Sequence, residues 1–314
     1  MAGNLGVGRV DPDVEADPVS GTVRWAPVKS IWYLGMSAAG LIGGALTFSW
    51  SALAVFLIST AITLCLGHSL GMHRRLIHRA YETPRWLEYF FVYLGTLVGM
   101  AGPLSMIRTH DLRDWAQRHA KCHDYFAHRQ SFWKDAWWQL SCDIQLAAPP
   151  RMRLIGEREN SRFYALLERT WMWQQLPWAI MFFAIGGWSW VFWGVCLRVT
   201  TGVTGHWLVG HFAHREGERT WHVTGAGVQG YNIRFAALVS FGEAWHNNHH
   251  AFPDSARFAH RPGEVDLGWW VLRSLERMGL ASNLVIPACM TAPNRLIALS
   301  ETSDPPAART SWRA

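Results

Sequence analysis

Two long runs of apolar residues that contain no charged side chain constrain the fold of this 314-residue chain most strongly. They extend over residues 31–50 and 52–66, and neither contains Asp, Glu, Lys or Arg. An α-helix of about 20 apolar residues crosses a bilayer, where every backbone polar group must be paired within its own segment. Because only a short stretch around Ser51 separates the runs, we predict a transmembrane hairpin with spans at about residues 31–50 and 52–70.

A second pair of apolar runs lies farther along the chain, over residues 171–185 and 188–203, with two glycines between them. It predicts a second hairpin, with spans at about residues 171–185 and 188–205. Each hairpin returns the chain to the side of the membrane from which it entered. The polar, histidine-rich segments that follow the two hairpins are therefore expected on the same side.

Basic residues identify that side. Arg24 and Lys29 precede the first hairpin, and Arg74, Arg75 and Arg79 follow it. By the positive-inside rule these residues lie in the cytoplasm. We therefore predict a multi-pass integral membrane protein whose active site faces the cytoplasm. Arg- and Ala-rich usage favours a bacterial inner membrane over the endoplasmic reticulum.

Composition excludes several other classes of protein. The formal net charge is +6, but the basic residues flank apolar runs and form no single stripe with interleaved aromatic residues, so no nucleic-acid partner is expected. The five Cys include no C-x-x-C pair, which argues against a zinc ribbon or a thioredoxin-like site. The 20 Trp suit rings placed at a membrane interface.

The predicted membrane domain covers residues 28–290, between a disordered N-terminal tail (1–27) and a C-terminal tail (291–314) that lack hydrophobic periodicity. Within it, residues 86–106 form a third apolar stretch. Arg85 and Arg108 at its ends favour a helix that lies in the cytoplasmic interface. The alternative is an ordinary spanning helix, which would place the histidines before and after it on opposite faces of the membrane.

Three histidines near the C-terminal end indicate a metal site. His246, His249 and His250 are spaced i, i+3 and i+4, and on an α-helix these positions share one face. A single histidine on such a face is more often a core or capping residue, but three imidazoles directed at one point are typical of metal ligands.

A second concentration of histidines follows the first hairpin, where His68, His73 and His78 form two overlapping H-x4-H frames. On a regular α-helix, residues i and i+5 diverge by about 140°. Such a pair can share a metal only near a helix end, which favours His73 with His78. This interpretation leaves His68 as a buried histidine or a support for a ligand.

The segment between the hairpins contains four more histidines. His119, Cys122 and His123 repeat the i, i+3, i+4 spacing, and His110 and His128 lie on either side of them. Nearby carboxylates are placed to accept the distal N–H of a ligating imidazole, which orients the ring. The carboxylates are Asp111, Asp114 and Asp124.

Three motifs resemble, in this order, the three histidine boxes of the membrane fatty acid desaturase family, most closely its acyl-CoA desaturase branch. They are His73-Arg-Arg-Leu-Ile-His78, His119-Ala-Lys-Cys-His123 and His246-Asn-Asn-His249-His250-Ala-Phe-Pro. The resemblance covers about residues 30–262. It implies an all-α integral membrane fold, with four transmembrane helices in two hairpins and a cytosolic helical cap. The cap would hold two iron ions that use dioxygen to insert a double bond into a fatty acyl chain, carried as acyl-CoA or acyl-lipid.

Carried over by motif position, the resemblance implies eight iron ligands: His73, His78, His119, His123, His211, His246, His249 and His250. Two positions depart from the family pattern. Cys122 stands where the second box has its middle histidine, and Trp207 stands where an asparagine precedes His211 by four residues. Cys122 is either a thiolate ligand or a small buried residue. Further ligands, or residues that support them, would come from a second set: His68, His110, His128, His206, His214, Asp114 and Glu243.

The predicted function is oxygen-dependent desaturation of an acyl chain within the bilayer. The sequence has no haem-attachment, iron–sulfur or dinucleotide motif, so electrons must come from a ferredoxin or a b-type cytochrome with its reductase. A hydroxylase or related oxygenase on the same scaffold is the alternative. A histidine-based metal transporter fits less well, because the apolar runs contain almost no ionisable residues.

Overall fold

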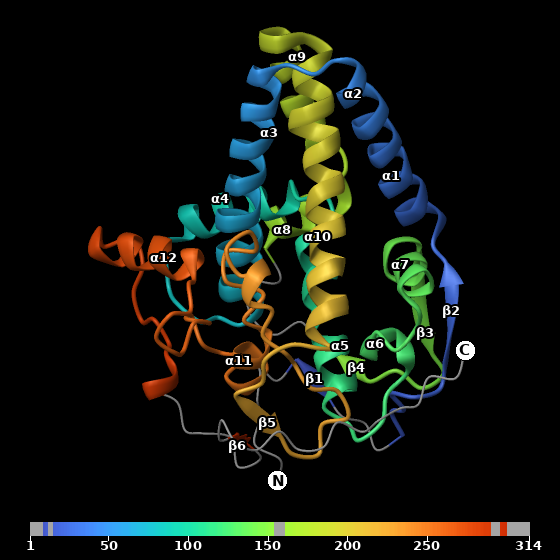
Figure 1. Cartoon of the computed structure of the whole chain (residues 1–314), viewed down its shortest axis with the longest axis vertical. Coiled ribbons are helices and arrows are strands. Elements are labelled where there is room, and N and C mark those ends of the chain that lie inside the picture. Colours follow the sequence, from blue (N-terminus) through green and yellow to red (C-terminus); the bar gives the residue numbers. More distant parts are fainter. Residues whose placement is uncertain (1–8, 12–14, 154–160, 290–295, 300–314) are drawn as a thin grey trace.

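The computed structural model describes residues 9–11, 15–153, 161–289 and 296–299. Apolar helices project from one end of a broader body that contains the shorter helices and strands (Figure 1). The first hairpin consists of two continuous helices, and the second begins with α9 and returns through α10. Their bounds are α1 Pro27–Ala38, η1 Ala39–Gly43 and α2 Gly44–Leu46; α3 Trp50–Ile62 and η2 Thr63–Ile77; α9 Gln175–Val191, η3 Phe192–Leu197 and α10 Arg198–Ala213.

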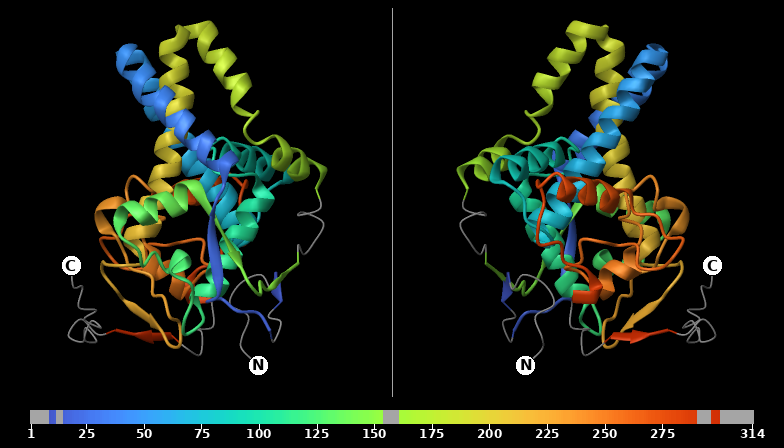
Figure 2. Two further views of the ribbon diagram at one scale, coloured as in Figure 1. Left: turned by 90° about the vertical axis from the view of Figure 1, so that its right-hand side faces the viewer. Right: turned by 90° about the vertical axis from the view of Figure 1, so that its left-hand side faces the viewer.

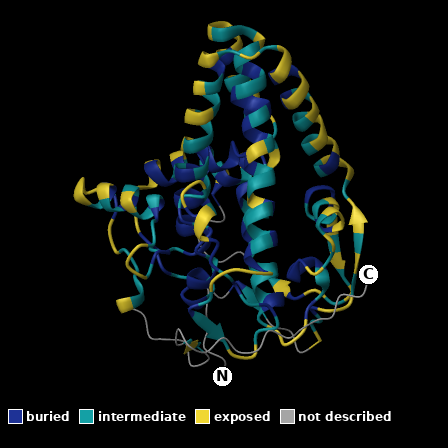
Figure 3. Cartoon of the chain, viewed as in Figure 1, coloured by how far each residue is buried: buried dark blue, intermediate teal, exposed yellow. Residues whose placement is uncertain are grey.

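Among the described residues, two helices are long and apolar enough to cross a membrane, Trp50–Ile77 and Gln175–Ala213. The second is broken at Gly187, whose φ of 63° and ψ of −160° lie outside the helical region. A glycine adopts this conformation without a Cβ clash, so the chain reverses here and forms a hairpin (Figure 2). In each helix only 28% of the most apolar window is buried within the protein. The outer faces of both hairpins are accordingly exposed or half-buried (Figure 3), as expected for lipid-facing surfaces.

Backbone-to-backbone packing anchors η2 against α4 (Arg85–Thr96). A Cβ added at Gly67 would lie 2.4 Å from the backbone nitrogen of Gly95, and one at Gly71 would lie 2.6 Å from the carbonyl carbon of Phe91. Only glycine permits this approach. Helix α4 lies alongside the lower part of η2, within the stretch predicted to be an interfacial helix.

The body contains the remaining helices, α5 Pro103–Gln117, α6 Asp124–Ala127, α7 Phe132–Ser141, α8 Arg162–Thr170, α11 His246–Ala251, α12 Leu267–Arg277 and the short η4 Arg234–Ala236 and η5 Pro287–Cys289. Buried ion pairs join η2 to this body. Arg74 contacts Asp266 at 2.9 Å, and Arg75 contacts Glu88 of α4 at 2.7 Å. The histidine-bearing end of η2 is thus held by charge pairs as well as by glycine packing.

The fold is mostly helical, as predicted, but the described residues also form three two-stranded antiparallel sheets. They pair β1 Val10–Asp11 with β4 Arg151–Met152, β2 Gly21–Trp25 with β3 Cys142–Leu146, and β5 Trp221–Val223 with β6 Leu296–Ala298.

Strands β1 and β2 correct the prediction of a disordered N-terminal tail. Residues 21–25 pair along their whole length with β3, because backbone pairing needs no hydrophobic periodicity. Residues 296–298 pair with β5 in the same way. Of the predicted tails, residues 1–8, 12–14, 291–295 and 300–314 lie outside the described residues.

Candidate metal centre

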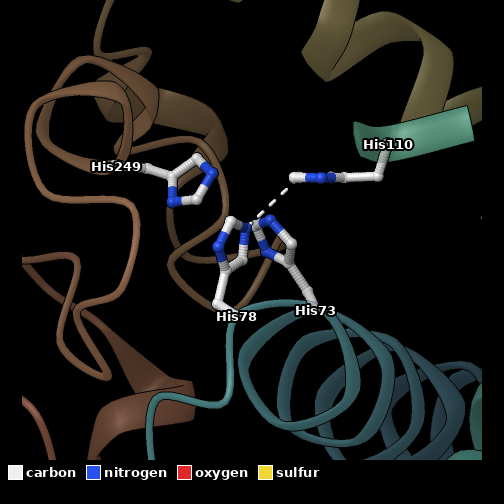
Figure 4. A group of neighbouring side chains, drawn as sticks. All are labelled: His73, His78, His110 and His249. Carbon is white, nitrogen blue, oxygen red and sulfur yellow. Dashed lines mark hydrogen bonds between the residues drawn. The ribbon is translucent and has the colours of Figure 1, made fainter. Parts of the chain in front are cut away.

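Four histidines from three separate segments converge in the body. His73 lies on η2 and His78 directly follows it, while His110 comes from α5 and His249 from α11. Each offers one ring nitrogen, and these four atoms lie within 4.8 Å of one another. Figure 4 shows the rings of His73 and His78 directed from the helix end toward those of His110 and His249. We call these residues the first histidine group.

The winding of η2 explains how His73 and His78 meet. The segment is a π-helix, in which backbone hydrogen bonds join residues i and i+5 and so place these residues over one another. The ring centroids of His73 and His78 are 4.8 Å apart. Divergence by about 140° applies to an α-helix, so the H-x4-H spacing matches the helix type present here. His68, one π-turn earlier, stacks on His73 with ring centroids 6.3 Å apart.

The second histidine group consists of His214, His246 and His250. His214 follows the last residue of α10, and the other two lie on α11. Nε2 of His246 lies 3.1 Å from Nε2 of His214 and 3.0 Å from Nε2 of His250. Three ring nitrogens therefore face one another.

These contacts suit a bound cation better than hydrogen bonds. Burial, together with the neighbouring histidines, holds the pKa of His214 and His246 well below the usual value, so both rings are neutral at pH 7. A neutral imidazole carries one N–H, and His214 donates its Nδ1–H to the carbonyl oxygen of Gly210 at 2.7 Å. The Nε2 lone pair of His214 then points at Nε2 of His246. A single N–H on Nε2 of His246 can be donated to His214 or to His250, but not to both. A metal ion would satisfy all three lone pairs.

A carboxylate orients the first group. Oε2 of Glu243 lies 2.5 Å from Nδ1 of His73, and Oε1 accepts a hydrogen bond from Ser69 at 2.5 Å. Burial would raise the pKa of Glu243, but His73 and Arg74 outweigh it and hold the pKa at about 2. The ionised carboxylate accepts the Nδ1–H of His73, leaving Nε2 available for a metal. In the same group, Nδ1 of His249 is buried without a partner among the described residues.

Asp114 lies one helical turn after His110 on α5, so the two side chains share a face. Burial would raise the pKa of Asp114, but the charges of His110 and Arg118 hold it at about 2, with smaller contributions from His250 and His246. The carboxylate is thus ionised, and the charges of His250 and His246 in the second group act on it. Asp114 belongs to none of the three histidine motifs, so the sequence predicted it only as a possible additional ligand or supporting residue.

Three other polar residues form a separate buried group, His128, Asp135 and His211. A single oxygen of Asp135, Oδ2, accepts from Nδ1 of His128 at 2.9 Å, Nδ1 of His211 at 2.7 Å and Nε1 of Trp207 at 2.8 Å. Nε2 of His128 in turn lies 2.5 Å from Arg113. Hydrogen bonds thus engage Oδ2 of Asp135, both nitrogens of His128 and Nδ1 of His211, and the group is separate from the two histidine groups. His211, predicted as a ligand, lies in this group, whereas His214 lies in the second histidine group.

The motif predicted as the second box lies elsewhere. Helix α5 ends at Gln117, so His119 falls beyond it and is exposed, with Nδ1 directed at the carbonyl oxygen of Trp115. His123 accepts a hydrogen bond from the backbone of Tyr125 at the start of α6. Cys122 is buried among Tyr125, Phe126 and Ala127, and burial raises the pKa of its thiol to about 11, as expected for a small core residue. His206, also considered, contacts His68 with ring centroids 5.1 Å apart.

Comparison with known proteins relates this chain to one enzyme family. The profile of the family described as fatty acid desaturase matches residues 48–281. The chain is 34% identical over 264 residues to the sn-1 stearoyl-lipid 9-desaturase of Anabaena variabilis, covering 83% of this chain and 94% of that protein. It is 33% identical over 247 residues to an acyl-CoA 5-desaturase of Anemone leveillei, covering 77% and 74%. It is 32% identical over 244 residues to the sn-2 palmitoyl-lipid 9-desaturase of a Nostoc species, covering 76% and 83%.

Proposed function

This chain belongs to the fatty acid desaturase family, and we propose that its two histidine groups hold the two iron ions of a di-iron centre. The protein is an oxidoreductase, a desaturase that introduces double bonds into the acyl chains of lipids or acyl-CoA. Bound iron supplies the activation of dioxygen and the removal of hydrogen from unactivated C–H bonds. The observation that carries the metal assignment is the set of three Nε2 atoms that face one another, of which His214 contributes a lone pair.

The ligand set that we propose differs from the one implied by the sequence motifs. One iron would be held by the first histidine group, and the other by the second group together with Asp114. His119, His123 and His211 are left out, because they lie on the surface, at a helix start and in the Asp135 network. The chain itself orients the rings: Glu243 holds His73, and the carbonyl oxygen of Gly210 holds His214.

We propose four membrane spans, at about residues 31–50, 52–70, 171–185 and 188–205, with the body in the cytoplasm. Two observations support this arrangement. The break at Gly187 divides the longer apolar helix into two antiparallel segments. The two histidine groups also lie at the same end of the hairpins. The domain would extend over residues 28–290.

For the substrate, we propose saturated acyl chains of membrane lipids with desaturation at position 9. The chain covers 94% and 83% of two relatives named stearoyl-lipid and palmitoyl-lipid 9-desaturases. The electron donor would be a ferredoxin or a b-type cytochrome with its reductase.

The test is to express the chain with such a donor in a host that lacks 9-desaturation, then to measure iron per chain and the fatty acids of its lipids. We expect about two irons per chain and new 9-monounsaturated chains. His249→Ala should lose both the products and at least half of the iron. Hydroxylated products would reassign the enzyme as an oxygenase, and zinc without any product would contradict the di-iron proposal.

A further inference from the structure

The motif His119-Ala-Lys-Cys-His123 lies outside the metal groups, on a surface built from two segments. Residues 117–130 follow α5, and residues 219–229 include β5. Backbone hydrogen bonds join them: Gly227 donates to the carbonyl oxygen of His119 at 2.7 Å, and Val228 donates to that of Gln117 at 3.3 Å. We call these two segments together the basic face.

The basic face has an uneven charge. Its residues include four cations and one carboxylate, Arg118, Lys121, Arg129, Arg219 and Asp124. Lys121, Arg129 and His119 are exposed. Asp124 accepts a hydrogen bond from Gln130 at 2.8 Å, and Arg118 also contacts Asp114 at 3.3 Å. A positive surface of this kind attracts an acidic partner and accelerates its approach.

The basic face lies at the end of the molecule opposite the turn of α9, as the positions of β5 and the end of α5 show in Figure 1. It is nevertheless close to the metal centre, because α5 connects the two. From Asp114 to Arg118 the chain rises by only about 6 Å. Trp115, next to Asp114, contacts the exposed ring of His119, with centroids 4.7 Å apart.

The reaction creates a need for such a partner. Removing two hydrogen atoms from a –CH2–CH2– unit provides two of the four electrons that reduce dioxygen to two water molecules. The other two electrons and two protons must come from outside the substrate, and the sequence has no haem-attachment, iron–sulfur or dinucleotide motif of its own. We propose that the basic face is the docking surface for an acidic one-electron carrier protein, which passes electrons along α5. This inference rests on the proposed function.

The experiment uses the purified, iron-loaded enzyme in lipid nanodiscs with two acidic carriers in turn, a plant-type [2Fe–2S] ferredoxin and the soluble domain of cytochrome b5. Turnover is measured against carrier concentration for the wild type and for Lys121→Glu with Arg129→Glu. The matched control is Arg169→Glu with Arg277→Glu, which reverses two exposed cations on α8 and α12, beside the hairpins. A parallel single turnover with dithionite and dioxygen bypasses the carrier.

We expect the double reversal on the basic face to raise KM for an effective carrier at least tenfold, with the dithionite-driven product unchanged. The control should behave as the wild type. Raising the salt from about 0.01 M to about 0.15 M shortens the Debye length from about 30 Å to about 8 Å, and it should slow the wild type more than the basic-face variant.

Unchanged KM in the basic-face variant, or an equal increase in the control, would overturn the proposal. Salt-independent reduction of the wild type, or no reduction by either carrier, would do the same. Failure of the dithionite reaction in the wild type would instead count against the proposed di-iron function.

Discussion

The backbone N–H of His78 donates to the carbonyl oxygen of His73 at 3.0 Å, which is the i→i+5 bond of a π-helix. This bond places the two histidines in register on one side of the helix. The H-x4-H spacing therefore has a structural cause, since four intervening residues complete one π-turn.

The first prediction distinguishes the proposed ligand set from the one implied by the motifs. His110→Ala should abolish activity and reduce bound iron, because His110 lies in the first group at 3.3 Å from Nε2 of His78. Asp114→Ala should lose the iron of the second group. His119→Ala and His123→Ala should keep both irons and at least half of the activity with a chemical reductant. Iron analysis of the four purified variants checks this, and iron loss in the last two would restore the motif-based assignment.

The second prediction concerns Glu243. Replacing it by Ala removes the acceptor that orients His73, and loss of such a supporting carboxylate weakens metal affinity by about 10- to 100-fold. Glu243→Gln keeps one oxygen acceptor for either Ser69 or His73 and should fall between Ala and wild type. Competitive titration of the metal-free variants with Co²⁺ measures the affinity directly. An affinity of Glu243→Ala equal to that of wild type would show that His73 needs no such support.

The third prediction concerns the packing of η2 against α4. A methyl group at Gly67 would lie 2.4 Å from the backbone of both Leu94 and Gly95, so the two helices must separate. Overpacking of this kind costs about 1–3 kcal/mol or more. The matched control is Gly35→Ala, since a Cβ at Gly35 meets nothing within 4 Å. Thermal unfolding in detergent should show a lower midpoint for Gly67→Ala alone; equal midpoints would mean that the close approach is absent in solution.

The fourth prediction is a loss of stability in mild acid. Burial lowers the pKa of His260 to about 4, whereas a histidine in the unfolded chain titrates near 6.5. Between these values the unfolded chain binds a proton that the folded protein excludes, so the free energy of unfolding decreases as the pH falls from about 6.5 to about 4. His260→Gln should show a smaller decrease in thermal midpoint between pH 7 and pH 5, because it lacks this titration. An equal decrease in both proteins would exclude His260 as a contributor.

The hairpins and the histidines of the first and third boxes were predictable because their patterns are local. A long uncharged apolar run favours a long apolar helix, and the spacing of His246, His249 and His250 places them on one helix face. The same reasoning preferred His119 and His123 over His110 because their spacing repeats that pattern. It failed to foresee that α5 ends at Gln117, which turns His119 toward the surface.

Long-range contacts account for the remaining differences. His211 and His214 are three residues apart and equally plausible as ligands by spacing. The structure separates them because His214 lies with His246 and His250, whereas His211 lies with His128 and its partner Asp135, which is distant in sequence. The local sequence around His211 does not indicate that Asp135 is its partner. The strands of the predicted tails depend on distant pairing in the same way.

The contact between Gly67 and Gly95 has a mechanical consequence. Where side chains separate two helices, small displacements are absorbed by rotamer changes; here backbone lies on backbone, and no soft layer intervenes. Helix α4 and residues 67–71 of η2 should therefore move together as a rigid unit, so that a tilt of α4 also moves His73 and His78.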